Sequence, residues 1–222
     1  MFASLLHVAW PASCPLCGKL GTPFCGECLE SVMEDALIFC VDCGGAAPCA
    51  LHPAAPRCFA VSSYSGPARD AVLSMKYENG RGTAFLMGEL IARRFAKPNV
   101  DFLIPVPLHK YSERDYNQAE FIARGAGSVW RIPVKSPLSW RRGSLRQALK
   151  SGVEDRNLPE DVITGSGLPG GASVFIVDDV FTSGSTIRAA ARALEGLGAS
   201  VNGAVVWSKS GGSMKRYVDR AV

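Results

Sequence analysis

The most informative stretch of the chain reads Val174-Phe-Ile-Val-Asp178-Asp179-Val-Phe-Thr182-Ser183-Gly184-Ser185-Thr186-Ile187. It opens with a short apolar, β-branched run at 174–177, which is typical of a buried strand. Two acids follow, and a run of small hydroxyl residues then leads into a predicted helix over 183–197 that ends at Gly198. In open α/β sheets, ligands bind at the carboxyl ends of the strands, so the acids stand where a site is expected.

Strand-like and helix-like segments alternate along the rest of the chain after residue 58. Further strands are predicted at 59–64, 101–106 and 201–207. Helices are predicted from Gly66 onward, over 83–96 and over 117–130, while 136–168 is basic, polar and weakly periodic, typical of a loop or irregular hood. This alternation predicts βαβ units and an α/β class with a mostly parallel sheet.

Composition limits the possible classes of protein. The 222 residues are 47% hydrophobic with a formal net charge of +4, which is ordinary globular composition that permits an anionic ligand without demanding one. No apolar run of membrane-spanning length is present. The opening segment 1–10 has no basic region, so a short amphipathic helix is favoured over a signal peptide, and a cytoplasmic location is expected.

The turn after the two acids has the residue types of a phosphate site. Backbone N–H groups and hydroxyls over Thr182, Ser183, Gly184, Ser185 and Thr186 can form a cup at a helix start, assisted by the helix dipole. Asp178 and Asp179 are acceptor-only groups when ionised, and they suit the vicinal hydroxyls of a sugar. Together they indicate a site for a sugar 5-phosphate. By contrast, the Gly-x-Gly-x-x-Gly pattern at 165–170 precedes a strand, so we interpret it as a loop.

Eight cysteines lie between Cys14 and Cys58, and six of them form pairs separated by two residues. Such spacing lets two thiolates face one tetrahedral Zn²⁺. The first predicted quartet is Cys14, Cys17, Cys25 and Cys28. For the second, Cys40 and Cys43 need two more ligands, and Cys49 and His52 are favoured over Cys58; an interleaved arrangement, with Cys14 and Cys17 joining Cys40 and Cys43, stays open. We expect a structural zinc-ribbon module over 1–58 and a second domain over 59–222.

Several motifs together resemble one family. Asp178–Thr186 is similar to the signature for phosphoribosyl pyrophosphate (PRPP) of type I phosphoribosyltransferases. The segments 104–110 (Ile-Pro-Val-Pro-Leu-His-Lys) and 114–118 (Arg-Asp-Tyr-Asn-Gln) resemble hallmarks of the ComF (competence protein F, GntX-like) family, with Asp115 in place of the usual glycine. Lys76-Tyr77 and the cysteine module extend this resemblance over nearly the whole chain.

The resemblance implies a type I phosphoribosyltransferase fold behind a double zinc ribbon. It implies that Asp178 and Asp179 bind the ribose hydroxyls of PRPP, that 182–186 binds the 5-phosphate, and that Mg²⁺ accompanies the ligand. The turn after Ile104 should hold pyrophosphate, and its candidate residues are Pro107, Leu108, His109, Lys110 and Arg114. Basic residues of the hood, Arg142, Arg146, Lys150 and Arg156, are weaker candidates for the same charge.

Three functions remain open at this point. The first is a phosphoribosyltransferase, a glycosyltransferase of the pentosyl class, with an unidentified acceptor. The second is a competence factor that binds single-stranded DNA or a DNA-uptake helicase, as the family's link to natural transformation implies; the basic segment 131–156 with Trp130 and Trp140 would supply charge and stacking. The third is a sensor that binds PRPP without turnover.

Overall fold

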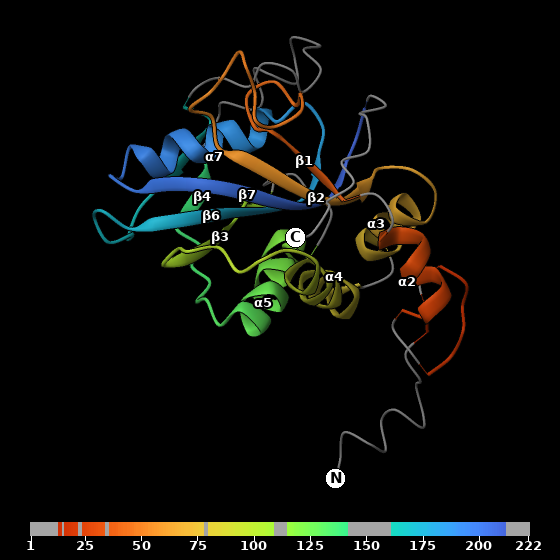
Figure 1. Ribbon diagram of the computed structural model, residues 1–222. Helices are drawn as coiled ribbons and strands as arrows, with labels where there is room; N and C mark the ends of the chain where they lie inside the picture. Colours follow the sequence, from red (N-terminus) through yellow and green to blue (C-terminus); the bar gives the residue numbers. More distant parts are fainter. Residues whose placement is uncertain are drawn as a thin grey trace, which may run out of the picture.

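A twisted sheet of five strands forms the centre of the molecule in the computed structural model (Figure 1). The structure describes residues 13–14, 16–21, 24–33, 36–77, 80–108, 115–141 and 161–211. The strand order is β1-β2-β7-β6-β3, and every neighbouring pair is parallel except β1 with β2. This confirms the predicted α/β class and the mostly parallel sheet.

The predicted strands and helices of the sheet are found with small shifts at their ends. The strands are β2 (Arg57–Ser63), β3 (Phe102–Pro105), β6 (Ser173–Phe181) and β7 (Ser200–Lys209). The helices are α3 (Gly66–Tyr77), α4 (Arg81–Arg94), α5 (Gln118–Trp130) and α7 (Ser185–Glu195). Strand β6 therefore contains both acids and stops just before the hydroxyl-rich turn.

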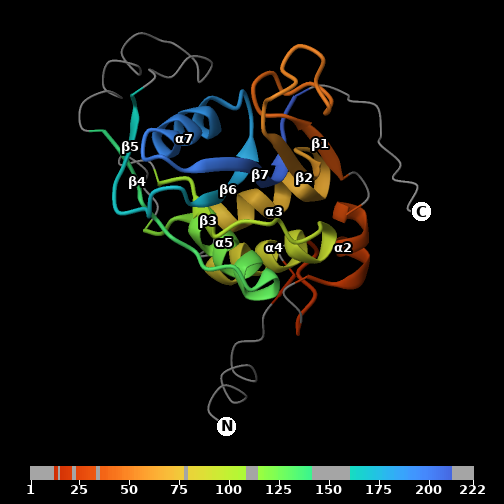
Figure 2. The same ribbon diagram turned by 60° about the vertical axis from the view of Figure 1, so that its left-hand side comes forward.

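Each face of the sheet is covered by a different set of elements (Figures 1 and 2). Helices α3, α4 and α5 pack on one face around a core that includes Met75, Met87 and Ile122. Helix α7 packs on the other face around a core that includes Ile176 and Leu194. Because both faces are covered, the central strands are apolar along nearly their whole length, as expected for a parallel sheet.

Four elements were not predicted from the sequence. Helix α2 (Gly26–Met33) and strand β1 (Leu37–Cys40) lie within the cysteine-rich region, and β1 joins the main sheet by pairing with β2. A small antiparallel pair, β4 (Leu138–Trp140) with β5 (Ile163–Gly165), occurs inside the segment predicted to be loop or hood. These strands have three or four residues each, too few for a periodic pattern to be recognised.

Some predicted features lie outside the described residues, namely the helix at 1–10 and most of the hood, 142–160. The Gly-x-Gly-x-x-Gly pattern begins at the end of β5 and continues as a loop into β6, as predicted. Among the helices described here, none is long and apolar enough to cross a membrane.

Helices α4 and α5 approach each other unusually closely at two glycines. A Cβ atom on Gly88 would lie 2.0 Å from the carbonyl oxygen of Ile122, and one on Gly125 would lie 1.9 Å from that of Phe85. Glycine allows this approach because it has no Cβ. Close packing of this kind fixes α4 and α5 relative to each other.

Candidate functional site

Asp178 and Asp179 lie near the carboxyl end of β6, where the sequence predicts a ligand site. The backbone N–H of Asp179 donates a hydrogen bond of 2.8 Å to Oδ1 of Asp178. Neighbouring residues of a strand point to opposite sides, so the two carboxylates meet different surroundings. Both nevertheless line one cavity of about 320 Å³.

Lys76, at the end of α3, provides the counter-charge for this acidic pair. Its Nζ lies 2.8 Å from Oδ2 of Asp179, and both side chains are largely buried, with 19% and 15% exposed. The pKa of Asp178 is raised well above its usual value by loss of water around the carboxyl and then by the charge of Asp179; Lys76 only partly offsets this. Asp178 therefore holds its proton more readily than an exposed aspartate, while Asp179 is paired with Lys76. The oxygens of both carboxyl groups can accept hydrogen bonds from donors such as sugar hydroxyls.

The hydroxyl-rich turn connects β6 to α7. Thr182 and Thr186 line the same cavity as the acids, while Ser183, Gly184 and Ser185 form the rest of the turn. Gly184 has φ +75°, a left-handed conformation that favours glycine. The Ser183 hydroxyl donates to Ser185 Oγ over 3.0 Å. Since the first-turn N–H groups of a helix have no intrahelical acceptor, this turn offers donors to an anion.

The turn after β3, the strand next to β6, forms another wall of the cavity. Pro107 and Leu108 line the cavity together with Asn117 and Trp140. The Trp140 Nε1 donates to the carbonyl oxygen of Pro107 over 2.8 Å, which connects the small β4–β5 sheet to this turn. The other candidates for pyrophosphate, His109, Lys110 and Arg114, lie outside the described residues.

Asn117 connects this turn to α5. Its Nδ2 donates to the Val106 carbonyl over 2.9 Å, while its Oδ1 accepts from the Ala119 N–H over 3.1 Å as the N-cap of α5. Asn117 therefore has a structural role on both sides of the turn.

We predict that Asn117→Ala lowers the free energy of unfolding by about 1–2 kcal/mol, because it removes the N-cap and the bond to Val106. In a chain of this size, that corresponds to a fall in Tm of about 2–8 °C. Asn117→Asp keeps the capping acceptor and loses the donor, so its Tm should lie between those of wild type and Asn117→Ala. Equal Tm values for wild type and Asn117→Ala would contradict the assigned role.

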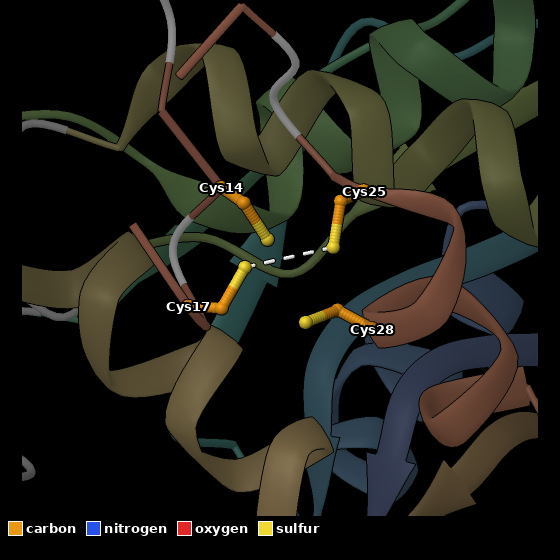
Figure 3. Close-up of side chains that lie close together, drawn as sticks. All are labelled: Cys14, Cys17, Cys25 and Cys28. Atoms are coloured by element: carbon orange, nitrogen blue, oxygen red, sulfur yellow. Dashed lines mark hydrogen bonds between the residues drawn. The ribbon is translucent and has the colours of Figure 1, made fainter. Parts of the chain in front are cut away.

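The first four cysteines converge in space. The Sγ atoms of Cys14, Cys17, Cys25 and Cys28 all lie within 4.8 Å of one another, and Figure 3 shows them pointing toward a common centre. The Cys17 and Cys25 sulfurs are 3.5 Å apart. A Zn–S distance of about 2.3 Å in a tetrahedron places sulfurs about 3.8 Å apart, so the arrangement fits zinc.

The second group consists of Cys40, Cys43, Cys49 and His52, whose ligand atoms also lie within 4.8 Å of one another. The Cys49 Sγ is 3.6 Å from that of Cys43 and 3.5 Å from Nδ1 of His52. The grouping is thus sequential rather than interleaved. Cys58 belongs to neither group: it is fully buried on β2, opposite Phe39 of β1.

The charges of the cysteines favour a bound cation. Burial raises the pKa of Cys14, but hydrogen bonds from backbone N–H groups, first that of Cys25, bring the pKa to about 6. The pKa of Cys28 is raised, chiefly by its contact with the Cys25 thiol. Closely spaced thiolates cannot all ionise without a counter-charge, which a divalent metal would supply. Both clusters could hold zinc, and neither has an obvious open position for catalysis.

The two clusters share a local backbone fold that was not predicted from the sequence. In each, the first cysteine donates its N–H to a carbonyl five residues on, Cys14 to Lys19 and Cys40 to Gly45. In each, the glycine after the second cysteine, Gly18 or Gly44, has positive φ and donates to the first cysteine's carbonyl. These equivalent Cys-x-x-Cys-Gly knuckles are a structural repeat.

Two residues gain roles that sequence reasoning did not assign. Lys76 was noted only as part of a motif, and the structure places it against Asp179. Asp115 pairs with Arg81, with 2.7 Å between Oδ2 and Nη2. Neither pairing could be read from spacing, because the partners come from distant segments.

The family model described as "Phosphoribosyl transferase domain" matches residues 132–220, a range that includes Asp178, Asp179 and the turn to α7. This match supports a phosphoribosyltransferase-like domain in the C-terminal part of the chain. A search of curated proteins finds no match.

Three similar solved structures have low identity. One, titled as the allosteric regulatory enzyme of purine biosynthesis, has 22% identity and a TM-score of 0.40 over 59% of this chain, which covers only 26% of that protein. Adenine phosphoribosyltransferase from Thermoanaerobacter pseudethanolicus has 14% identity and a TM-score of 0.35, covering 60% of this chain and 80% of that one. The Trypanosoma brucei enzyme, in complex with AMP, pyrophosphate and ribose-5-phosphate, has 7% identity and a TM-score of 0.35, with 88% of each chain covered.

Proposed function

We propose that the chain binds PRPP, or a related ribose 5-phosphate compound, together with Mg²⁺ and transfers the phosphoribosyl group to a nitrogen nucleophile. The observation that carries the proposal is the lining of one cavity by two carboxylates, Thr182 and Thr186 of the hydroxyl-rich turn, and the Pro107-Leu108 turn. Residues 1–58 would form the zinc module, whose strand β1 extends the edge of the main sheet, and residues 59–222 the transferase-like domain.

Each wall of the cavity would bind one part of the ligand. Asp178 and Asp179 would accept hydrogen bonds from the ribose hydroxyls, and the turn over 182–186 would donate to the 5-phosphate. The turn at Pro107 and Leu108 would face the pyrophosphate. Mg²⁺ would be held mainly by ligand oxygens and would neutralise charge on the leaving pyrophosphate.

Transfer requires no covalent intermediate with the protein. The bond from the anomeric carbon to the pyrophosphate oxygen breaks and its electron pair leaves with pyrophosphate. A nitrogen lone pair forms the new bond to carbon, and that nitrogen's proton passes to solvent. The protein would contribute by positioning the two reactants and stabilising developing charge.

Calorimetric titration of the zinc-loaded protein with PRPP and Mg²⁺ tests the proposal. Saturable binding is expected, and the Asp178→Ala/Asp179→Ala variant should bind at least about 100-fold more weakly, because two charge-assisted hydrogen bonds are lost. Asp70→Ala, which removes an exposed carboxylate of α3, is the control and should bind like wild type. Absence of binding to folded wild-type protein would refute the proposal.

Release of pyrophosphate with candidate nitrogen acceptors would then separate an enzyme from a sensor that binds PRPP without turnover. The role in DNA uptake that the ComF resemblance implies stays a prediction. One of its supports is removed, since Trp130 is buried with its Nε1 directed at the Phe95 carbonyl and cannot stack on a base.

A further inference from the structure

One arginine connects the hydroxyl-rich turn to the second cysteine knuckle. The Nη1 of Arg188, on the first turn of α7, donates to the carbonyl oxygen of Ser183 over 2.9 Å. The same nitrogen donates to the carbonyls of Asp42 and Val41 over 3.0 and 3.2 Å. Val41 and Asp42 are the two residues between Cys40 and Cys43, so a single nitrogen joins the backbone of the knuckle to that of the turn.

Side-chain packing supports the same connection. A Cβ atom on Gly184 would lie 2.6 Å from the Phe181 ring and 2.8 Å from Nη1 of Arg188. Both side chains therefore pack directly against the turn. The Phe181 ring meets Phe39 of β1 edge-on, with centroids 4.6 Å apart. A Cβ atom on Gly44 would lie 3.3 Å from the same Phe181 ring. The second knuckle therefore forms the back wall of the turn.

The three carbonyl oxygens would repel one another without the cation between them. A guanidinium nitrogen has two N–H donors, so the three carbonyls must share them, with at least one N–H between two acceptors. This sharing requires that the knuckle and the turn keep their relative positions. Such charge-assisted hydrogen bonds are stronger than neutral ones. A shift of the Cys40–Cys43 turn would consequently move the Ser183 carbonyl and the N–H groups of the turn beyond it.

We propose that Arg188 is a positioning residue that couples metal binding at the second cysteine cluster to phosphate binding at the turn over 182–186. The coupling rests on the proposed function, because the occupant of the turn is a sugar phosphate. Thermodynamic linkage makes the effect reciprocal: metal in the second cluster strengthens phosphate binding, and phosphate strengthens metal retention.

The first cluster serves as an internal control. It lies with α2 beside α3, away from α7, as the two views show (Figures 1 and 2). Its neighbourhood packs through contacts such as that of Phe24 with Trp207, whose ring centroids are 6.0 Å apart. Ligand at the turn should leave zinc at this cluster unaffected.

The test follows zinc loss from the zinc-loaded full chain to a chromogenic chelator, with and without ribose 5-phosphate. We expect the ligand to slow release from the second cluster by about 5-fold or more, the lower end of usual coupling between sites, with no change at the first. Cys17→Ser and Cys43→Ser variants identify which kinetic phase belongs to which cluster. Arg188→Met should release zinc from the second cluster faster without ligand, bind ribose 5-phosphate about 5-fold more weakly and lose the protective effect.

Arg93→Met is the control, since Arg93 is an exposed arginine in the last turn of α4, on the face of the sheet opposite to α7. It should behave like wild type in all these measurements. If ribose 5-phosphate binds equally to wild type and Arg188→Met, and zinc release is the same in both, the inference is overturned while the proposed function stands. If wild type binds neither ribose 5-phosphate nor PRPP, both are overturned.

Discussion

Gly88→Ala is expected to lower the free energy of unfolding by about 3 kcal/mol or more, with a fall in Tm of about 6–12 °C. The new Cβ would lie 2.0 Å from the Ile122 oxygen and 2.7 Å from the Ala126 nitrogen. Both are backbone atoms of α5, so no side-chain rotation can relieve the overlap. The helices must separate, which exposes core residues between them. Thermal and urea denaturation of the zinc-loaded protein would measure the loss.

Gly82→Ala makes the same chemical change on the same helix and is the control. Apart from its chain neighbours and the backbone of its own helix turn, no heavy atom lies within 4 Å of a Cβ built on Gly82. Because alanine is favoured over glycine in helices by about 0.5–1 kcal/mol, this variant should be slightly more stable than wild type. An unchanged Tm for Gly88→Ala would show that α4 and α5 pack less closely than described.

Asp178→Asn is expected to raise Tm at neutral pH while greatly weakening PRPP binding. The pKa of Asp178 is raised well above 3.8 in the folded protein, mainly by burial and then by Asp179. The folded state thus holds the Asp178 proton more tightly than the unfolded state does. Stability is therefore lost as pH rises from about 3.8, the pKa in the unfolded chain, towards the raised pKa of the folded protein. Asparagine keeps the acceptor for the Asp179 N–H and avoids the charge.

The pH dependence of the Tm gain identifies ionisation of Asp178 as its cause. The Tm gain of Asp178→Asn over wild type should be larger at about pH 8 than at about pH 5.5, where more of the wild-type Asp178 is protonated. Asp179→Asn is the informative comparison, because it removes the partner of largely buried Lys76 and should not give the same gain. If the gain in Tm did not depend on pH, ionisation of Asp178 would not be the cause of the lost stability.

The sequence showed the local part of this architecture because that part depends on neighbours along the chain. The apolar run before Asp178, the hydroxyl turn and the alternation of elements predicted strand, site and helix in order. The two-residue cysteine spacing predicted both clusters, including the choice of Cys49 and His52. Strand β1 was missed since four residues, one of them a cysteine, carry no periodic pattern.

What the sequence by itself determined is therefore the α/β class, the place of the acids at a strand end and the residues able to bind metal. Only the tertiary structure decided which distant residues meet there: Lys76 with Asp179, Arg188 with the Cys40–Cys43 turn, and the backbones of α4 and α5 at Gly88. The physical reason is that strand and helix patterns arise from repeats of a few residues. Pairings across the fold depend instead on how the packed elements place each side chain, which no local spacing encodes.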